Sequence, residues 1–468
     1  MRTAIWHVAG SKWLFVAKAC LILAACLILA MFCSAALADD DDAASTGKDA
    51  AAVPLETAEP RPDGSQATHR QVRRIDFSGG VKLASFCLLP DGRIVAALEP
   101  ANQVADASGD AGLGAAVLGL FSGKQKKSPA AAEKPLDGRS EIRLLDPQGK
   151  LLKRWPVKFK VQAVNVDSQG QIFAGGEGQL ASFDQDGRLL ATSEAPQIPA
   201  VRANPDALRA QAQEVLDSQK NAVQEFIKST EEQLKQYAGK SDKELSADER
   251  ADKQQKELML KHLKSIAVRN LAPTQTIEQV EEQLLSQRKR INALAVSDRY
   301  VFITCGAPKG YGYAVWRVDR KFENPKMIVK SLSGCCGQMD IQCDGDELVV
   351  AENSRHRVVR YSAEGKQISS FGKRSRDGQL ECFGGCCNPM NVQARGDRLY
   401  VSESDGQVKL FQKDGKFLAL VGVAEVKPGC KSSSIGVAAD GKRVYYIDVN
   451  NSAILLLEPK AAALSLTK

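Results

Sequence analysis

The sequence predicts an all-β protein, a six-bladed β-propeller with an inserted pair of helices. The first observation is a repeat, because Cys336 and Cys387 are 51 residues apart and Gly365 and Gly415 are 50 apart. The second is that each copy holds four short segments rich in β-branched and aromatic residues, separated by Asp-Gly-type turns. The third is that the last copy has only three such segments. Repeats of this kind are typical of blades arranged in a ring.

The expected strands follow in chain order. Blade one takes residues 83–89, 93–99, 141–145 and 151–157, blade two 161–166, 171–174, 179–183 and 188–192, and blade three 291–296, 300–304, 313–318 and 327–329. Blades four and five are the two clear copies, which begin at Gly334 and Gly385. Blade six offers residues 435–438, 443–449 and 453–458, and residues 72–77 supply its missing strand. This pairing would close the ring and remove its exposed edges.

The first 38 residues predict export. A basic segment ends at Lys18, an apolar run follows, and small residues close at Ala38 before the acidic Asp39. This order is typical of a cleaved signal peptide, although residues 19–38 are also long enough for an uncleaved membrane anchor. Either way, we expect the bulk of the chain in the periplasm or cell envelope, with a membrane contact only if the leader remains.

The chain beyond the leader divides by composition. Residues 39–70 are polar and lack an apolar period, so we expect a disordered tether. Residues 71–203 hold the closing strand and blades one and two, interrupted by a Gly- and Ala-rich loop at 101–140 that we expect to be mobile. A helical insertion follows at 204–290, and blades three to six occupy 291–468.

The insertion at 204–290 carries helix signals throughout. Asn204 precedes a proline, and Ser246 and Thr276 each begin a capping box. Apolar residues fall on one stripe, so the helices are expected to pack as a coiled-coil-like hairpin. Whether the hairpin acts as a spacer or lid, or captures a partner, stays open.

Both insertions are expected on one face of the propeller. In an antiparallel blade, the connections from strand two to three and from one blade to the next leave by the same face. The loop at 101–140, the insertion at 204–290 and the cysteine pairs all fall in these connections, whereas the Asp-Gly turns fall in the others. Functional loops are commonly mounted on a rigid scaffold in this way.

The charge balance excludes one class of partner. The formal net charge is +7, and three of these charges belong to the leader. The remaining excess is too small to predict nucleic-acid binding.

The cysteines are the first candidates for chemistry. In an exported protein, disulfides are the expected state, and the propeller candidates for bridging or redox chemistry are Cys335, Cys336, Cys382, Cys386, Cys387 and Cys430. Cross-blade bridges, such as Cys336 to Cys387 or Cys382 to Cys430, compete with strained vicinal disulfides and with metal binding. Nine cysteines follow the leader, so at least one cannot pair within the chain.

Oxygen ligands at the channel are the second set of candidates. The residues expected to line it and bind a ligand are Asp340, Glu352, Asn391, Glu403 and His356. These acids could hold calcium, but the pattern specifies no metal site, and no cofactor is predicted. Histidine is too scarce for a multi-histidine site, and we expect His356 to stabilise a turn.

The clearest blade carries a family resemblance. The run from Val349 to Tyr361, followed by Glu364-Gly365-Lys366 and a Phe-Gly pair, resembles the NHL repeat. The chain is similar to exported bacterial six-bladed propellers of the NHL, or TolB-like, type, often from planctomycetes. These share the Gly-Cys-Cys-Gly-Gln-Met-Asp segment, the Gly-Gly-Cys-Cys-Asn-Pro-Met-Asn segment and a helical insert. The resemblance covers roughly residues 71–460 and implies a fold and a binding habit without a settled reaction.

The sequence thus favours an exported interaction module, with no catalytic residue assigned. It is expected to bind a protein, peptide or cell-envelope ligand on the insert-bearing face. An enzyme is the alternative, using either thiol-disulfide chemistry at the cysteine pairs or calcium-assisted, lactonase-like hydrolysis in the channel.

Overall fold

The computed structural model describes residues 64–77, 80–101, 139–241, 244–268, 275–308, 312–335, 337–375, 377–385, 387–427 and 434–461. The predictions for 1–38, most of 39–70 and most of 101–140 lie outside these residues. Among the helices that are described, none is both long and apolar enough to cross a membrane.

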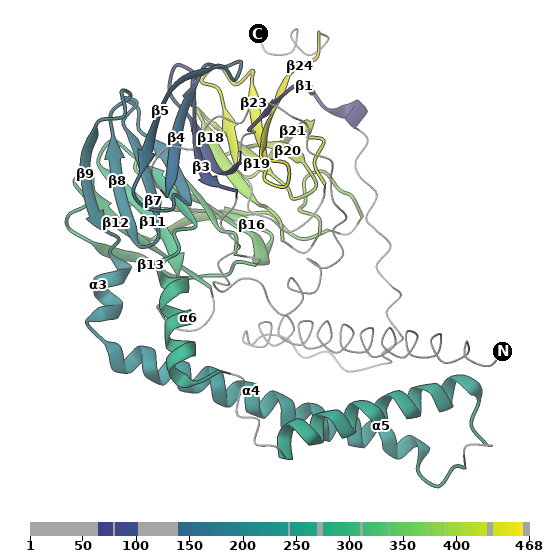
Figure 1. The fold of residues 1–468 in the computed structure, drawn as a ribbon. Coiled ribbons are helices and arrows are strands. Elements are labelled where there is room, and N and C mark those ends of the chain that lie inside the picture. Colours follow the sequence, from purple (N-terminus) through teal and green to yellow (C-terminus); the bar gives the residue numbers. More distant parts are fainter. Residues whose placement is uncertain are drawn as a thin grey trace, which may run out of the picture. The chain divides into compact units, whose positions relative to one another are not determined.

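The strands form six four-stranded antiparallel sheets, which confirms the predicted all-β propeller (Figure 1). Blade one holds β2 (Val81–Leu88), β3 (Ile94–Pro100), β4 (Ser140–Leu145) and β5 (Leu151–Val157). Blade two holds β6 (Ala163–Val166), β7 (Ile172–Gly176), β8 (Gln179–Phe183) and β9 (Leu189–Glu194). Blade three holds β10 (Ala293–Val296), β11 (Tyr300–Gly306), β12 (Tyr313–Asp319) and β13 (Lys326–Leu332).

The remaining strands follow the same order. Blade four holds β14 (Asp340–Asp344), β15 (Glu347–Glu352), β16 (Arg357–Tyr361) and β17 (Gln367–Phe371). Blade five holds β18 (Asn391–Arg395), β19 (Arg398–Ser402), β20 (Gln407–Gln412) and β21 (Phe417–Val423). Blade six holds β22 (Ile435–Val437), β23 (Val444–Asp448) and β24 (Ala453–Pro459), and its outer strand is β1 (His69–Asp76).

The ring closes through the first strand, as predicted. Strand β1 pairs antiparallel with β24, with Ile75 opposite Ile454. The first strands of successive blades contact one another in the order β2, β6, β10, β14, β18, β22 and back to β2. Blade six therefore combines strands from the two ends of the propeller sequence, and the hydrogen bonds between β1 and β24 close the ring.

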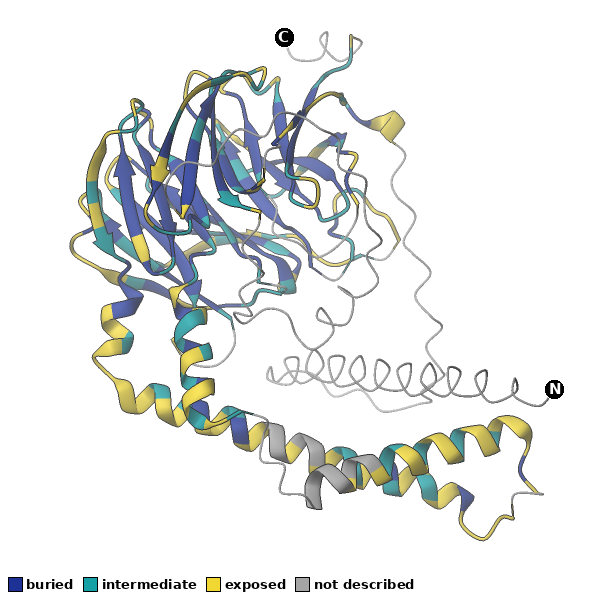
Figure 2. Cartoon of the chain, viewed as in Figure 1, coloured by how far each residue is buried: buried dark blue, intermediate teal, exposed yellow. Residues whose placement is uncertain are grey.

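The core lies between the blades. Figure 2 shows buried colour along most inner strands, while the helices are largely exposed. Each interface packs aliphatic and aromatic side chains from neighbouring sheets; Phe302, Val315 and Ile341, for example, join blades three and four. Burial of this alternating apolar surface is the main stabilising term of the propeller.

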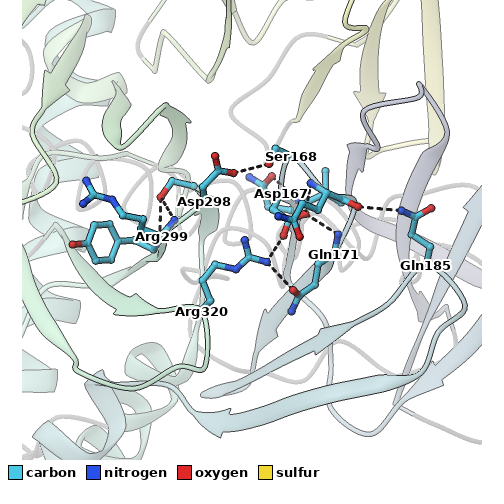
Figure 3. A network of polar contacts seen from close by, with 12 residues as sticks. Asp167, Ser168, Gln171, Gln185, Asp298, Arg299 and Arg320 are labelled. Atoms are coloured by element: carbon cyan, nitrogen blue, oxygen red, sulfur yellow. Dashed lines mark hydrogen bonds and ion pairs between the residues drawn. The ribbon is translucent and has the colours of Figure 1, made fainter.

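Polar contacts join the tight turns at one end of the six sheets. We call this the turn face; it carries the connections between strands one and two and between strands three and four. Figure 3 shows Arg320 of blade three bound to Asp167 and Gln171 of blade two, and Ser168 donating to Asp298 at 2.6 Å. Further pairs between neighbouring blades are Arg93–Gln185, Lys153–Asp186, Arg299–Asp346, Lys413–Asp344, Tyr400–Gly441 and Tyr445–Pro147. These contacts hold neighbouring blades together at the turn face.

The described residues between β9 and β10 form four α-helices: α3 (Gln197–Arg202), α4 (Pro205–Leu234), α5 (Ala247–Val268) and α6 (Ile277–Lys289). The expected caps are present, because Asn204 accepts from the Ala207 N–H and Thr276 forms a capping box with Gln279. Helix α4 packs on α6 through Leu208, Ala212, Val215, Leu216, Ile277, Val280 and Leu284 and also contacts α5. Helix α3 was not predicted, because it is short and contains Pro199, a residue that disfavours the interior of a helix.

Candidate functional site

The cysteine loops leave the propeller by the face opposite the turn face. This loop face carries the connections between strands two and three and between successive blades. The connection from β9 to β10, which contains the helices, belongs to it. The loops at 333–339, before blade four, and at 372–390, before blade five, belong to it as well. The helices and the two cysteine loops therefore all belong to the loop face.

Buried side chains of blade four fix the loop at 333–339. The Glu352 carboxylate, fully buried at the end of β15, accepts from the Ser333 N–H at 2.8 Å. Its other oxygen accepts from Arg357 Nε at 2.5 Å. Asn353 accepts from the Cys335 N–H at 2.8 Å and donates to the Gln338 carbonyl at 3.1 Å. A carboxylate and an amide thus hold both ends of the short loop.

Blade five repeats the arrangement with a different cation. The buried Glu403 carboxylate accepts from the Gly384 N–H and from Asn388 Nδ2, each at 3.2 Å. Lys409 pairs with Glu403 and donates to the Cys382 carbonyl at 2.6 Å. Both ionic side chains are almost fully buried, with side-chain exposures of 3% and 1% for Lys409 and Glu403. A buried pair of this kind requires good geometry to offset desolvation.

The two cysteine loops are also bound to each other and to the chain just beyond α6. His356 Nε2 lies 3.1 Å from the Gly385 carbonyl. Gln338 donates to the Met390 carbonyl at 3.2 Å. Arg290 and Asn292 both donate to the Gly337 carbonyl, at 3.2 and 2.7 Å. Blades three, four and five are therefore connected in sequence across the loop face.

Asp340 and Asn391 begin the first strands of blades four and five. Asp340 accepts from the Val392 N–H at 3.0 Å, and Asn391 accepts from Ser402 Oγ at 3.0 Å. Asp340 therefore joins blade four to blade five, and the Asn391 side chain also bonds the Asp340 carboxyl across the two blades. Burial raises the pKa of Asp340 to about 7, against the opposing effect of the Val392 N–H.

Further along the same first strands, a polar contact bridges two blades that are not neighbours. Asn165 of β6 donates to the Leu294 carbonyl of blade three at 2.6 Å. Its amide also donates to Gln342 Oε1 of blade four at 3.4 Å. The inner strands of blades two and four are thus within side-chain reach of each other at this level, which restricts the channel there.

The predicted cysteines are placed only in part. Cys336, Cys386 and Cys430 lie outside the described residues, so the proposed cross-blade bridges stay predictions. Cys382 and Cys387 are buried and Cys335 is half-buried. Burial raises the pKa of the Cys382 thiol, and that thiol donates to Gln379 at 3.4 Å. A raised pKa disfavours the reactive thiolate at Cys382.

The described residues contain no group of three or more His, Cys, Asp or Glu side chains that could hold a metal ion. Oxygens of Glu352 and Glu403 instead accept from protein donors. Calcium binding therefore stays a prediction made from the sequence alone.

Several residues of the loop face were missed by sequence reasoning. Asn353, Gln338 and Asn388 bind loop backbone, and their roles depend on loop shape, which no local pattern specifies. Lys409 did leave a signal, because it interrupts the apolar strand Gln407–Gln412. A lysine inside a buried strand indicates a buried acidic partner.

No protein-family model matches the chain, and no curated protein matches it. Among solved structures, it is similar to a gluconolactonase from Xanthomonas campestris, with 11% identity over 87% of this chain and 99% of that one and a TM-score of 0.40. It is also similar to regucalcin, a calcium-binding protein from Agrobacterium tumefaciens, with 10% identity over 84% and 95% of the two chains and a TM-score of 0.40.

The WD40 repeats of RRP9 match with 9% identity over 83% of this chain and 98% of that one and a TM-score of 0.39. Similarities this low assign no activity, ligand or partner to this chain. What the chain itself establishes is a closed propeller of six sheets whose cysteine loops are fixed on one face.

Proposed function

We propose that this protein is an exported, non-enzymatic binding module of the NHL propeller type. It would hold a protein, peptide or cell-envelope ligand on its loop face. Export and the NHL assignment rest on the leader and on the repeat from Val349 to Tyr361. The rigid sheets would supply the platform, and the connections would supply the contacts.

One observation carries this proposal. The two carboxylates best placed to do chemistry, Glu352 and Glu403, are buried and accept hydrogen bonds from the loops at 333–339 and 372–390. Side chains used in this way fix loop geometry. Preorganised loops lower the entropy cost of binding, which is what a recognition surface requires.

A hydrolytic enzyme is the second candidate, and two buried carboxyl groups favour it. Burial raises the pKa of Glu403 to about 7, although Lys409 pairs with that carboxylate. Burial raises the pKa of Asp340 to about 7, which suits a general acid or base near neutral pH. Asn391, at the matching position of blade five, could position a substrate beside it. Catalysis would also need a nucleophile or an activated water, and we assign neither role to any described residue.

The experiment masks one face at a time. A polyethylene glycol chain is attached to an azide-bearing residue at Asp377 on the loop face, or at Lys366 on the turn face; both positions are exposed. Envelope components retained by each masked protein are then measured by mass spectrometry. The proposal predicts loss of retained components with the mask at Asp377 and retention with the mask at Lys366. Equal retention by both proteins would contradict it.

A further inference from the structure

Three exposed cations lie close together on the loop face beside the cysteine loops. Arg355 occupies the connection between β15 and β16, and its side chain is 49% exposed. Lys373 and Arg374 begin the loop at 372–390 and are also exposed. We call these three residues the blade-four cationic patch.

Backbone contacts bring the two segments of this patch together. A Cβ placed on Gly372 would lie 2.8 Å from the His356 carbonyl oxygen, so the residues next to Arg355 and Lys373 touch. The Phe383 N–H donates to the Lys373 carbonyl at 2.9 Å, and Phe383 is fully buried. The position of the patch is thus fixed by the core of the blade.

Two of the three charges of the patch have no carboxylate partner among the described residues. Among the described ion pairs, Lys373 and Arg374 have no carboxylate partner. Arg355 lies 3.7 Å from Glu352, which is already bound by Arg357 at 2.5 Å. Asp377 and Glu381 are exposed on the same loop, and neither pairs with these cations. A ligand of opposite charge that binds Lys373 and Arg374 would therefore not have to displace an internal ion pair.

The chemistry of the patch selects among anionic ligands. Arginine presents a planar fork that matches carboxylates, and lysine adds a mobile point charge. Saccharide recognition favours exposed aromatic rings, whereas the exposed large apolar residues of the described chain are all aliphatic. Resting on the proposed function, we propose that the blade-four cationic patch binds an acidic segment, rich in Asp and Glu, of a protein partner.

The test uses the full chain and a fluorescent peptide of alternating Glu and Gly as the probe. The charge-reversed variant is Arg355→Glu, Lys373→Glu and Arg374→Glu combined. Its matched control reverses three exposed turn-face lysines, Lys150→Glu, Lys366→Glu and Lys416→Glu, so both variants have the same net charge. Thermal unfolding checks that each variant is folded. Binding is measured by fluorescence anisotropy across a salt series.

We expect the Kd of the probe to rise about tenfold or more in the loop-face variant and less than about twofold in the control, since exposed charge contacts contribute modestly and additively. Affinity for the intact protein should fall with salt. Equal weakening in both variants would show non-specific charge attraction and would overturn the proposal. Binding of inorganic phosphate or phosphatidylglycerol vesicles in place of the peptide would overturn the assignment to an acidic protein. If the probe does not bind while the mask at Asp377 still blocks envelope components, this inference fails and the proposed function stands.

Discussion

In blades four and five, a buried glutamate at the same repeat position accepts from the entry loop, but it pairs with a different cation in each blade. Glu352 and Glu403 are 51 residues apart, and each accepts from a backbone N–H at the entry to its own blade. In blade four the cation is Arg357, whose side chain is 26% exposed. In blade five it is Lys409, which is buried and also holds the Cys382 carbonyl.

The difference follows from loop length. The connection before blade four spans 333–339, and Glu352 with Asn353 suffices to hold it. The connection before blade five spans 372–390 and carries Cys382 in its interior. A longer loop loses more conformational entropy on ordering, so an additional buried donor is needed to fix it. The glutamate at the repeated position thus binds the entry loop in both blades, whereas the residue that pairs with it differs with the length of the loop.

The largest expected effect comes from removing each of the two cations in a separate variant. Lys409→Met leaves Glu403 without its cation in the interior, and we expect a loss of about 3–5 kcal/mol in the free energy of unfolding. Arg357→Met should cost only about 1 kcal/mol, because Arg355 remains near Glu352 and the Arg357 side chain is itself partly exposed to water. Urea denaturation of both variants measures the difference.

A double variant serves as the control for this pair. Glu403→Gln with Lys409→Met removes both charges, so it should recover a substantial part of the loss seen in Lys409→Met alone. Equal costs for the two single variants would contradict the distinction between the blades.

The turn glycines give the second comparison. Gly365 and Gly415 both adopt positive φ, 88° and 95°. A Cβ on Gly365 would collide with the Ile328 backbone, whereas one on Gly415 would meet the Phe371 side chain. The overlap at Gly365 is deeper and is with a carbonyl group, whereas the nearest atoms at Gly415 are Cβ and Cγ of Phe371. Gly365→Ala should therefore cost roughly 3 kcal/mol and Gly415→Ala roughly 2 kcal/mol. A calorimetric Tm that falls further in the blade-five variant would refute this ordering.

The third comparison concerns pH. Burial raises the pKa of Asp340 to about 7, above its ordinary value of 3.8, so the folded state holds the proton more tightly than the unfolded state. The resulting stabilisation is complete below the unfolded pKa and is lost as pH rises towards 7. Asp340→Asn gives blade four the residue that blade five has at Asn391 and removes this titration.

Urea denaturation at about pH 4.5 and about pH 7.5 tests this prediction. The intact protein should lose roughly 2 kcal/mol more than Asp340→Asn between these pH values, after allowance for partial exposure. Equal losses in the two proteins would mean that Asp340 is not perturbed by the fold.

The fold was predictable because its determinants are local and repeated. Alternating strand residues and Asp-Gly turns identify each blade, and the unpartnered strand around Ile75 completes the blade that lacks one. The roles at the loop face were less predictable. Glu352 and Glu403 look like channel acids in the sequence, but their partners Ser333 and Gly384 are backbone groups whose positions depend on loop conformation.

Binding on the loop face is tested most directly by photo-cross-linking in the native envelope. A photoreactive residue replaces Glu381 on the loop face or Lys416 on the turn face, both of which are exposed. We expect a discrete cross-linked species from position 381 and none from position 416. Cross-links from position 416 alone would contradict the assignment of the loop face as the binding surface.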